Sequence, residues 1–153
     1  MINLVYFGTS GHSVILLDHI KNSKGASISL VITKPDKPVG RDQKLSPSPV
    51  KTWCEKNGIP FITPSSLKKE LEDVTKAIIS ACDPSDSQTV GLVADYGLII
   101  PDELLNLFKN GVVNIHFSLL PKYRGASPVT YTILNGETQT GITFLQTTSE
   151  MDK

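Results

Sequence analysis

The chain has 153 residues and a formal net charge of +0 at pH 7, with 39% hydrophobic and 20% charged residues. These values are typical of one globular domain with a hydrophobic core, and they exclude a protein that binds nucleic acid through an overall basic field. No apolar run is long enough to span a membrane, and the first residues lack the basic start and the apolar length of a signal peptide.

The two cysteines and three histidines also limit the possible function classes. Cys54 and Cys82 do not form a CxxC pair, so we expect reduced thiols in a cytosolic protein. The histidines are scattered without the spacing of metal ligands, and no metal site is predicted. We therefore expect a cytoplasmic protein without a metal, and we also expect it to be a monomer.

The first predicted elements are those of an open α/β sheet. Residues 2–7 predict a strand, residues 8–11 a turn, and Ser13 caps a helix that runs to about Lys24. The turn reads Gly-x-x-Gly rather than Gly-x-Gly-x-x-Gly, so the dinucleotide-binding fingerprint is absent. Residues 27–33 predict the second strand because their apolar side chains alternate.

A long polar loop is predicted over residues 34–51, and such a loop in a compact domain is usually functional or disordered. Its five basic residues outnumber its two acidic ones and leave an excess of three positive charges. The basic residues are Lys34, Lys37, Arg41, Lys44 and Lys51, and the acidic ones are Asp36 and Asp42. This loop is either a phosphate-contacting surface or a solvated loop.

Helices and strands continue to alternate after the loop. Ser48 caps a helix with Pro49 in its first turn, Trp53 in the core and its end at residues 57–58. The next predicted elements are a short strand over residues 59–63, a helix from Ser65 or Ser66 to about Cys82, a buried strand over 89–94 and a helix from 101 to 110. The alternation predicts a Rossmann-like, mostly parallel sheet with helices on both faces.

Residues 112–117 predict a strand that carries the most informative pair of side chains. Asn114 and His116 share one face of it, and ligands bind at the carboxyl end of strands in an open sheet. A carboxamide and an imidazole side by side can donate hydrogen bonds to an oxygen that becomes negative during attack on a carbonyl. The other interpretation is a satisfied polar pair at a strand end. A helix over 128–135 and a strand over 140–147 follow.

The run over residues 114–125 resembles the signature of the folate-dependent formyltransferases. The match covers Asn114, His116, Ser118, Leu119, Leu120, Pro121, Arg124 and Gly125. The resemblance implies that Asn114 and His116 act on the formyl group of 10-formyltetrahydrofolate, and that the loop of Ser118, Leu119, Leu120 and Pro121 lies against this co-substrate. It also implies a pterin pocket lined by Tyr96, Gly97 and Leu98, which follow Asp95, a departure from the family pattern.

The resemblance further implies a catalytic aspartate beyond the last strand. Asp152 fits that position, and Glu150 is the rival carboxylate. The likeness extends along the whole chain but covers only the first part of the family's architecture. We therefore expect a partial catalytic domain over residues 1–153 without the C-terminal barrel domain of the tRNA-formylating members.

The long loop resembles that of the family members that formylate methionyl-initiator-tRNA. Matching positions are Pro35, Asp36, Pro38, Gly40, Arg41, Lys44, Leu45, Pro47, Ser48, Pro49, Val50 and Lys51. The resemblance implies that Arg41 and Lys44 contact the tRNA, and that the acceptor is the methionyl α-amine. Two alternatives stay open: a formyltransferase acting on a small amine (glycinamide ribonucleotide or an amino sugar nucleotide), which would not need this loop, and a non-catalytic remnant that binds folate or RNA.

Overall fold

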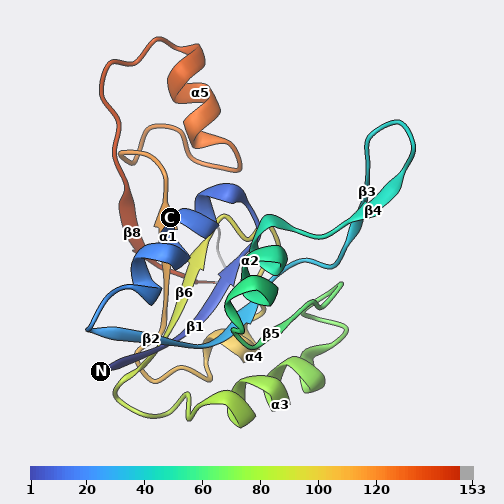
Figure 1. The fold of residues 1–153 in the computed structure, drawn as a ribbon. Coiled ribbons are helices and arrows are strands. Elements are labelled where there is room, and N and C mark those ends of the chain that lie inside the picture. Colours follow the sequence, from blue (N-terminus) through green and yellow to red (C-terminus); the bar gives the residue numbers. More distant parts are fainter. Residues whose placement is uncertain (149–153) are drawn as a thin grey trace.

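A six-stranded sheet runs through the middle of the molecule in the computed structural model, which describes residues 1–148 (Figure 1). Its strand order is β5-β2-β1-β6-β7-β8, and every neighbouring pair is parallel except β7 with β8. The strands are β1 (Ile2–Gly8), β2 (Ala26–Ile32), β5 (Phe61–Ile62), β6 (Thr89–Ala94), β7 (Val112–His116) and β8 (Thr143–Gln146). The predicted open, mostly parallel sheet is confirmed.

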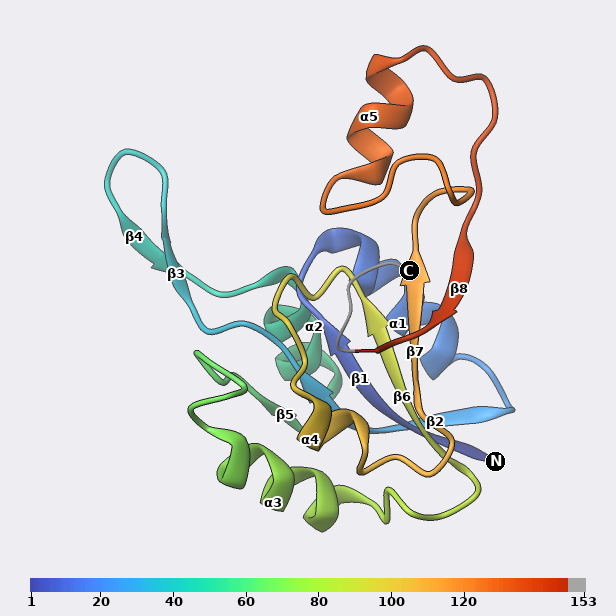
Figure 2. The same cartoon turned by 180° about the vertical axis from the view of Figure 1, so that it is seen from behind.

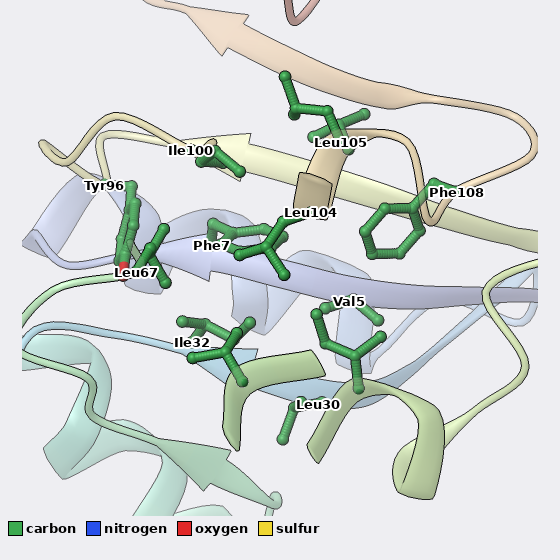
Figure 3. Close-up of a cluster of buried hydrophobic side chains, with 13 residues drawn as sticks. Val5, Phe7, Leu30, Ile32, Leu67, Tyr96, Ile100, Leu104, Leu105 and Phe108 are labelled. Atoms are coloured by element: carbon green, nitrogen blue, oxygen red, sulfur yellow. The ribbon is translucent and has the colours of Figure 1, made fainter. Parts of the chain in front are cut away.

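Helices cover both faces of this sheet, as predicted. On one face lie α1 (Gly11–Lys21) and α2 (Pro49–Asn57), and on the other lie α3 (Leu71–Ala81) and α4 (Asp102–Leu105) (Figure 2). The alternation of strand side chains builds the two cores, because Val5 and Phe7 point to the α3 and α4 side while Tyr6 points to the other. Figure 3 shows the first of these cores, in which Leu104 of α4 lies beside Phe7.

Two helix starts differ from their predictions. The cap of α1 is Ser10, whose hydroxyl oxygen accepts the backbone N–H of Ser13 at 3.4 Å. Ser13 is instead buried, and its hydroxyl donates to the carbonyl of Ala94 on β6. The prediction of Ser13 as the cap was therefore wrong, because that side chain ties the helix to the sheet. Ser48 caps α2 as predicted, with its hydroxyl oxygen 3.0 Å from the N–H of Lys51.

The elements on the α3 and α4 side are shorter than predicted. The carboxylate of Glu70 accepts the backbone N–H groups of Ser65 and Ser66 at 2.8 and 3.1 Å, which holds these residues in a turn before α3. Beyond the end of α4 the backbone closes i to i+3 bonds, including one from Phe108 to the carbonyl of Leu105 at 3.3 Å. This tighter turn folds the Phe108 ring back into the core.

Two segments project from the body (Figure 1). The long loop contains an antiparallel hairpin of β3 (Lys37–Val39) and β4 (Lys44–Ser46), where only a loop was predicted. The helix α5 (Pro128–Leu134) lies beyond the carboxyl ends of the central strands and begins at Pro128 as predicted. None of the helices within residues 1–148 has the length and apolar character that crossing a membrane requires.

Candidate active site

A cavity of about 840 Å³ opens at the carboxyl ends of β6 and β7, where the sequence predicted a ligand site. Four stretches line most of it, namely residues 95–100 after β6, 114–117 at the end of β7, 125–130 at the start of α5 and 145–148 around the end of β8. His12 from the start of α1 completes the rim. This volume lies within the range of about 300–1,000 Å³ that is usual for small-molecule sites.

Asn114 and His116 both line this cavity. They share one face of β7, and the next strand places Leu145 opposite Asn114 and Thr143 opposite His116. Within residues 1–148, no side chain or backbone group forms a hydrogen bond with the Asn114 carboxamide, so it can pair with a ligand. The sequence prediction that the two side chains reach one opening agrees with this placement.

The imidazole of His116 is held in one orientation. Its Nε2 lies 2.8 Å from the carbonyl oxygen of Tyr123, and because a carbonyl only accepts, Nε2 is the donor. The side chain is buried and only 7% exposed. With Nε2 engaged, a hydrogen bond from the ring to a ligand has to come from Nδ1, and Nδ1 donates only when the ring carries its second proton. The bond to Tyr123 therefore leaves Nδ1 as the ring nitrogen that is open to a ligand.

The loop after β7 packs against β8 rather than into the cavity. The Ser118 hydroxyl donates to the carbonyl of Lys122 at 2.7 Å, and the Thr143 hydroxyl donates to the carbonyl of Ser118 at 2.7 Å. The peptide bond between Leu120 and Pro121 is cis. Among the described residues that line the cavity, the predicted co-substrate residues Ser118, Leu119, Leu120 and Pro121 do not occur. Their role stays a prediction, and Asp152 and Glu150 lie outside the described residues.

The segment after β6 does line the cavity and is anchored in the core. The Tyr96 ring packs edge-on against Phe7, with centroids 5.7 Å apart, and its carbonyl accepts the Thr9 hydroxyl at 2.9 Å. Burial raises the pKa of Tyr96, so its ring stays neutral. Gly97 has a φ of +73°, and a Cβ at that position would lie 2.7 Å from Nζ of Lys34. Tyr96, Gly97 and Leu98, which the resemblance assigns to the pterin pocket, are thus all at the cavity.

The basic hairpin lies away from the cavity. Arg41 occupies its turn and Lys44 begins β4, and both side chains are exposed. Nζ of Lys51 lies 2.7 Å from the Asp36 carboxylate, so these two charges neutralise each other and the excess of three positive charges in the loop remains. The unpaired positive charges of the hairpin are therefore exposed, where the phosphates of a polyanion could reach them.

Comparison with known proteins identifies the family. The sequence profile of the formyl transferase family matches residues 2–153. The chain belongs to this family.

Curated relatives agree with this assignment, and a solved structure matches the fold. The chain is 41% identical to a methionyl-tRNA formyltransferase of Thermotoga maritima and 42% identical to one of Aromatoleum aromaticum, over 99% of its own length and 46% and 45% of theirs. The chain thus spans about half the length of the curated relatives it matches. Its fold matches a phosphoribosylglycinamide formyltransferase from Anaplasma phagocytophilum with a TM-score of 0.70 at 19% identity, covering 99% of this chain and 67% of that one.

Sequence reasoning found part of the cavity and missed part of it. The two residues of β7 and the segment after β6 are where the motifs indicated. His12 and the start of α5, residues 125–130, were not predicted to line the site. A signal for His12 was its position just after the first strand-to-helix turn, since such turns lie at the ligand-binding edge of an open sheet.

Proposed function

We propose that this site transfers the formyl group of 10-formyltetrahydrofolate to the α-amine of methionyl-initiator-tRNA. The observation that carries the proposal is the placement of Asn114 and His116 together at the cavity, with the imidazole held by Tyr123. Membership in the formyl transferase family supports the reaction class, and relatives at about 40% identity named methionyl-tRNA formyltransferase support the acceptor.

The cavity suits a folate as co-substrate. A pterin is a flat heterocycle with hydrogen-bonding edges, and residues 96–100 present irregular backbone and apolar side chains to the cavity. Backbone groups outside a strand ladder can pair with such edges, although the Tyr96 carbonyl already accepts the Thr9 hydroxyl. Tyr96, Gly97 and Leu98 would hold the pterin and so place the formyl carbon near β7.

The reaction needs no covalent enzyme intermediate. The nitrogen lone pair of the acceptor attacks the formyl carbon, and the carbonyl oxygen becomes an oxyanion. The Asn114 carboxamide and the Nδ1–H of protonated His116 donate to that oxygen. The bond from the formyl carbon to the folate nitrogen then breaks, and that nitrogen receives a proton. Asp152, proposed from the sequence motif, pairs with His116 and assists the proton movement.

The hairpin supports a tRNA as the acceptor. Arg41 and Lys44 on the exposed β3–β4 hairpin can contact RNA phosphates, which a small-amine acceptor does not need. The test compares formylation of methionyl-initiator-tRNA with that of glycinamide ribonucleotide by the intact protein. We expect the tRNA to be the better acceptor by kcat/KM, and preference for the small amine would overturn the assignment.

A matched variant sharpens this experiment. Arg41→Ala with Lys44→Ala should raise the KM for the tRNA and flatten its dependence on salt by about one phosphate contact for each residue removed. Lys76→Ala, a change of the same type on α3, should leave both unchanged, because Nζ of Lys76 already pairs with Glu72 at 2.5 Å. Unchanged salt dependence in the hairpin variant would show that the loop is merely solvated.

A further inference from the structure

A second histidine and a carboxylate meet at the mouth of the cavity. Nδ1 of His12, on the first turn of α1, lies 3.8 Å from Oδ2 of Asp95, in the turn after β6. Both side chains line the cavity and stay accessible, with 53% and 40% of their surfaces exposed. The His12 ring also lies against Phe117, with centroids 5.7 Å apart, so the pair has an apolar wall on one side.

Asp95 is unusual in its backbone and in its charge. Its φ of 49° lies in the left-handed region, which residues with side chains rarely adopt and which is enriched at functional sites. Its neighbour Tyr96 is locked in the core, so the turn aims the carboxylate at the rim. Among the described residues that line the cavity, Asp95 is the one acidic side chain.

Folding stability does not explain this arrangement. Ion pairs between side chains this exposed contribute little to folding, because water screens them. The carboxylate also accepts no hydrogen bond from the part of the chain that the structure describes. A carboxylate that lines a ligand cavity and lacks a donor is available to a cationic ligand.

We propose that Asp95 binds the ammonium form of the acceptor amine at the mouth of the cavity and that His12 takes up the proton which this amine must lose before it attacks. The inference rests on the proposed function, because it assumes that the acceptor is an amine. In this proposal Asp95 and His12 act on the acceptor amine, while Asn114 and His116 act on the oxyanion.

The proton movements balance with these groups alone. An N–H bond of the bound ammonium breaks, its electron pair stays on nitrogen, and the proton goes to the unprotonated nitrogen of the His12 imidazole. The neutral amine attacks the formyl carbon and gives up its second proton as the folate nitrogen gains one. The imidazolium left on His12 pairs with Asp95 until water removes its proton.

The other titratable groups near His12 do not replace it. Beneath the pair on β1, the Tyr6 hydroxyl donates to the carbonyl of Ser13 at 3.2 Å, and burial raises the pKa of Tyr6, so this hydroxyl stays neutral. On β7, His116 faces the same cavity, but its Nε2 is engaged by Tyr123. His19, on the same helix, binds the Ile15 carbonyl with its Nδ1 and does not line the cavity.

The role of Asp95 is tested by comparing how tightly the protein binds a ligand with an amine and a matched ligand with a hydroxyl group. The probes are methionine methyl ester and its α-hydroxy counterpart, titrated against the intact protein by calorimetry. We expect the amine to bind at least about tenfold more tightly, and Asp95→Asn to remove this preference. Glu103→Gln, which deletes an exposed carboxylate that does not line the cavity, should retain it. Equal binding of the two probes to the unaltered protein would overturn the proposal.

His12 is tested by the pH dependence of transfer to methionyl-initiator-tRNA. His12→Asn should lower kcat/KM about tenfold at pH 7, and the deficit should shrink towards pH 9, because free α-amines with a pKa near 7.7–8.0 are then neutral. His19→Asn is the matched control and should follow the unaltered protein. A deficit that is the same at all pH values would refute proton uptake. If the intact protein transfers no formyl group, the proposed function is wrong. The titration with the two probes would still show whether Asp95 binds an ammonium group.

Discussion

The body of the sheet and the segment that follows β7 are built differently. In the body, helices cover both faces and side chains such as Phe7 and Leu104 are fully buried. In the segment over residues 117–148, α5 exposes Ile133 and Leu134 at 72% each, and β8 exposes Phe144 at 62%. A few hydrogen bonds, rather than an apolar core, hold this segment.

The candidate active site lies on the boundary between these two regions. Strand β7 belongs to the body through β6, while the Nε2 bond of His116 goes to Tyr123 in the segment. The body therefore fixes where the reactive groups lie, and the segment sets how one of them is oriented.

The largest effect on stability is expected inside the body. Leu104→Ala should lower the free energy of unfolding by about 2–5 kcal/mol, because it removes buried apolar atoms and leaves a cavity beside Phe7. Leu134→Ala removes the same atoms from α5 and should change it by less than about 0.5 kcal/mol. Urea unfolding curves measure both. Equal losses would show that the segment carries a core of its own.

The largest effect on activity is expected at the boundary. His116→Ala should lower kcat by at least about a hundredfold, because it removes an oxyanion donor. Asn114→Ala should do the same with little change in the free energy of unfolding, because its carboxamide has no hydrogen-bond partner within residues 1–148. Single-turnover transfer from 10-formyltetrahydrofolate is the measurement. Near-normal turnover in either variant would remove that residue from the proposed mechanism.

Sequence patterns were sufficient to predict the elements of the body and also α5 and β8 of the segment, but not the contacts that hold the segment. Alternating strands and capped helices, such as the start of α2 at Ser48, are local signals that the packed core preserves. The contact of a co-substrate with the loop after β7 stays a prediction, and the structure adds that the Thr143 hydroxyl of β8 donates to the Ser118 carbonyl of this loop, 25 residues away in sequence. Such contacts between distant residues leave no periodic signal. The same holds for Nδ1 of His12 in α1 and Oδ2 of Asp95 after β6, which are 3.8 Å apart although the two residues are far apart in the sequence.

The smallest effects are expected at two glutamates, one in the segment and one in the body, which can be compared with each other. Glu137 accepts the Tyr123 hydroxyl at 2.7 Å and Nζ of Lys122 at 3.0 Å, and Glu70 accepts the Ser65 hydroxyl at 2.6 Å. These hydrogen bonds stabilise the charged carboxylates and so lower the pKa of both groups. The largest cause is the bond from Tyr123 for Glu137 and the bond from Ser65 for Glu70. Because each folded-state pKa lies below the usual 4.5, the stabilisation is present above that pH and is lost as pH falls through the lowered value.

Only one of these two carboxylates should affect catalysis. Glu137→Gln weakens the hold on Tyr123, whose carbonyl orients His116, so kcat should fall by less than about tenfold. The Lys122 amide donates to the carbonyl of Leu119 at 3.2 Å, and in the same variant its protection against hydrogen exchange, relative to an unfolded chain, should be lower at neutral pH and should no longer fall as the pH drops below 4.5. Glu70→Gln is the matched change in the body and should leave kcat unaltered, since its partners do not line the cavity. Equal kcat in the two variants would mean that Tyr123 is held by its backbone alone and that the segment does not transmit orientation to the imidazole.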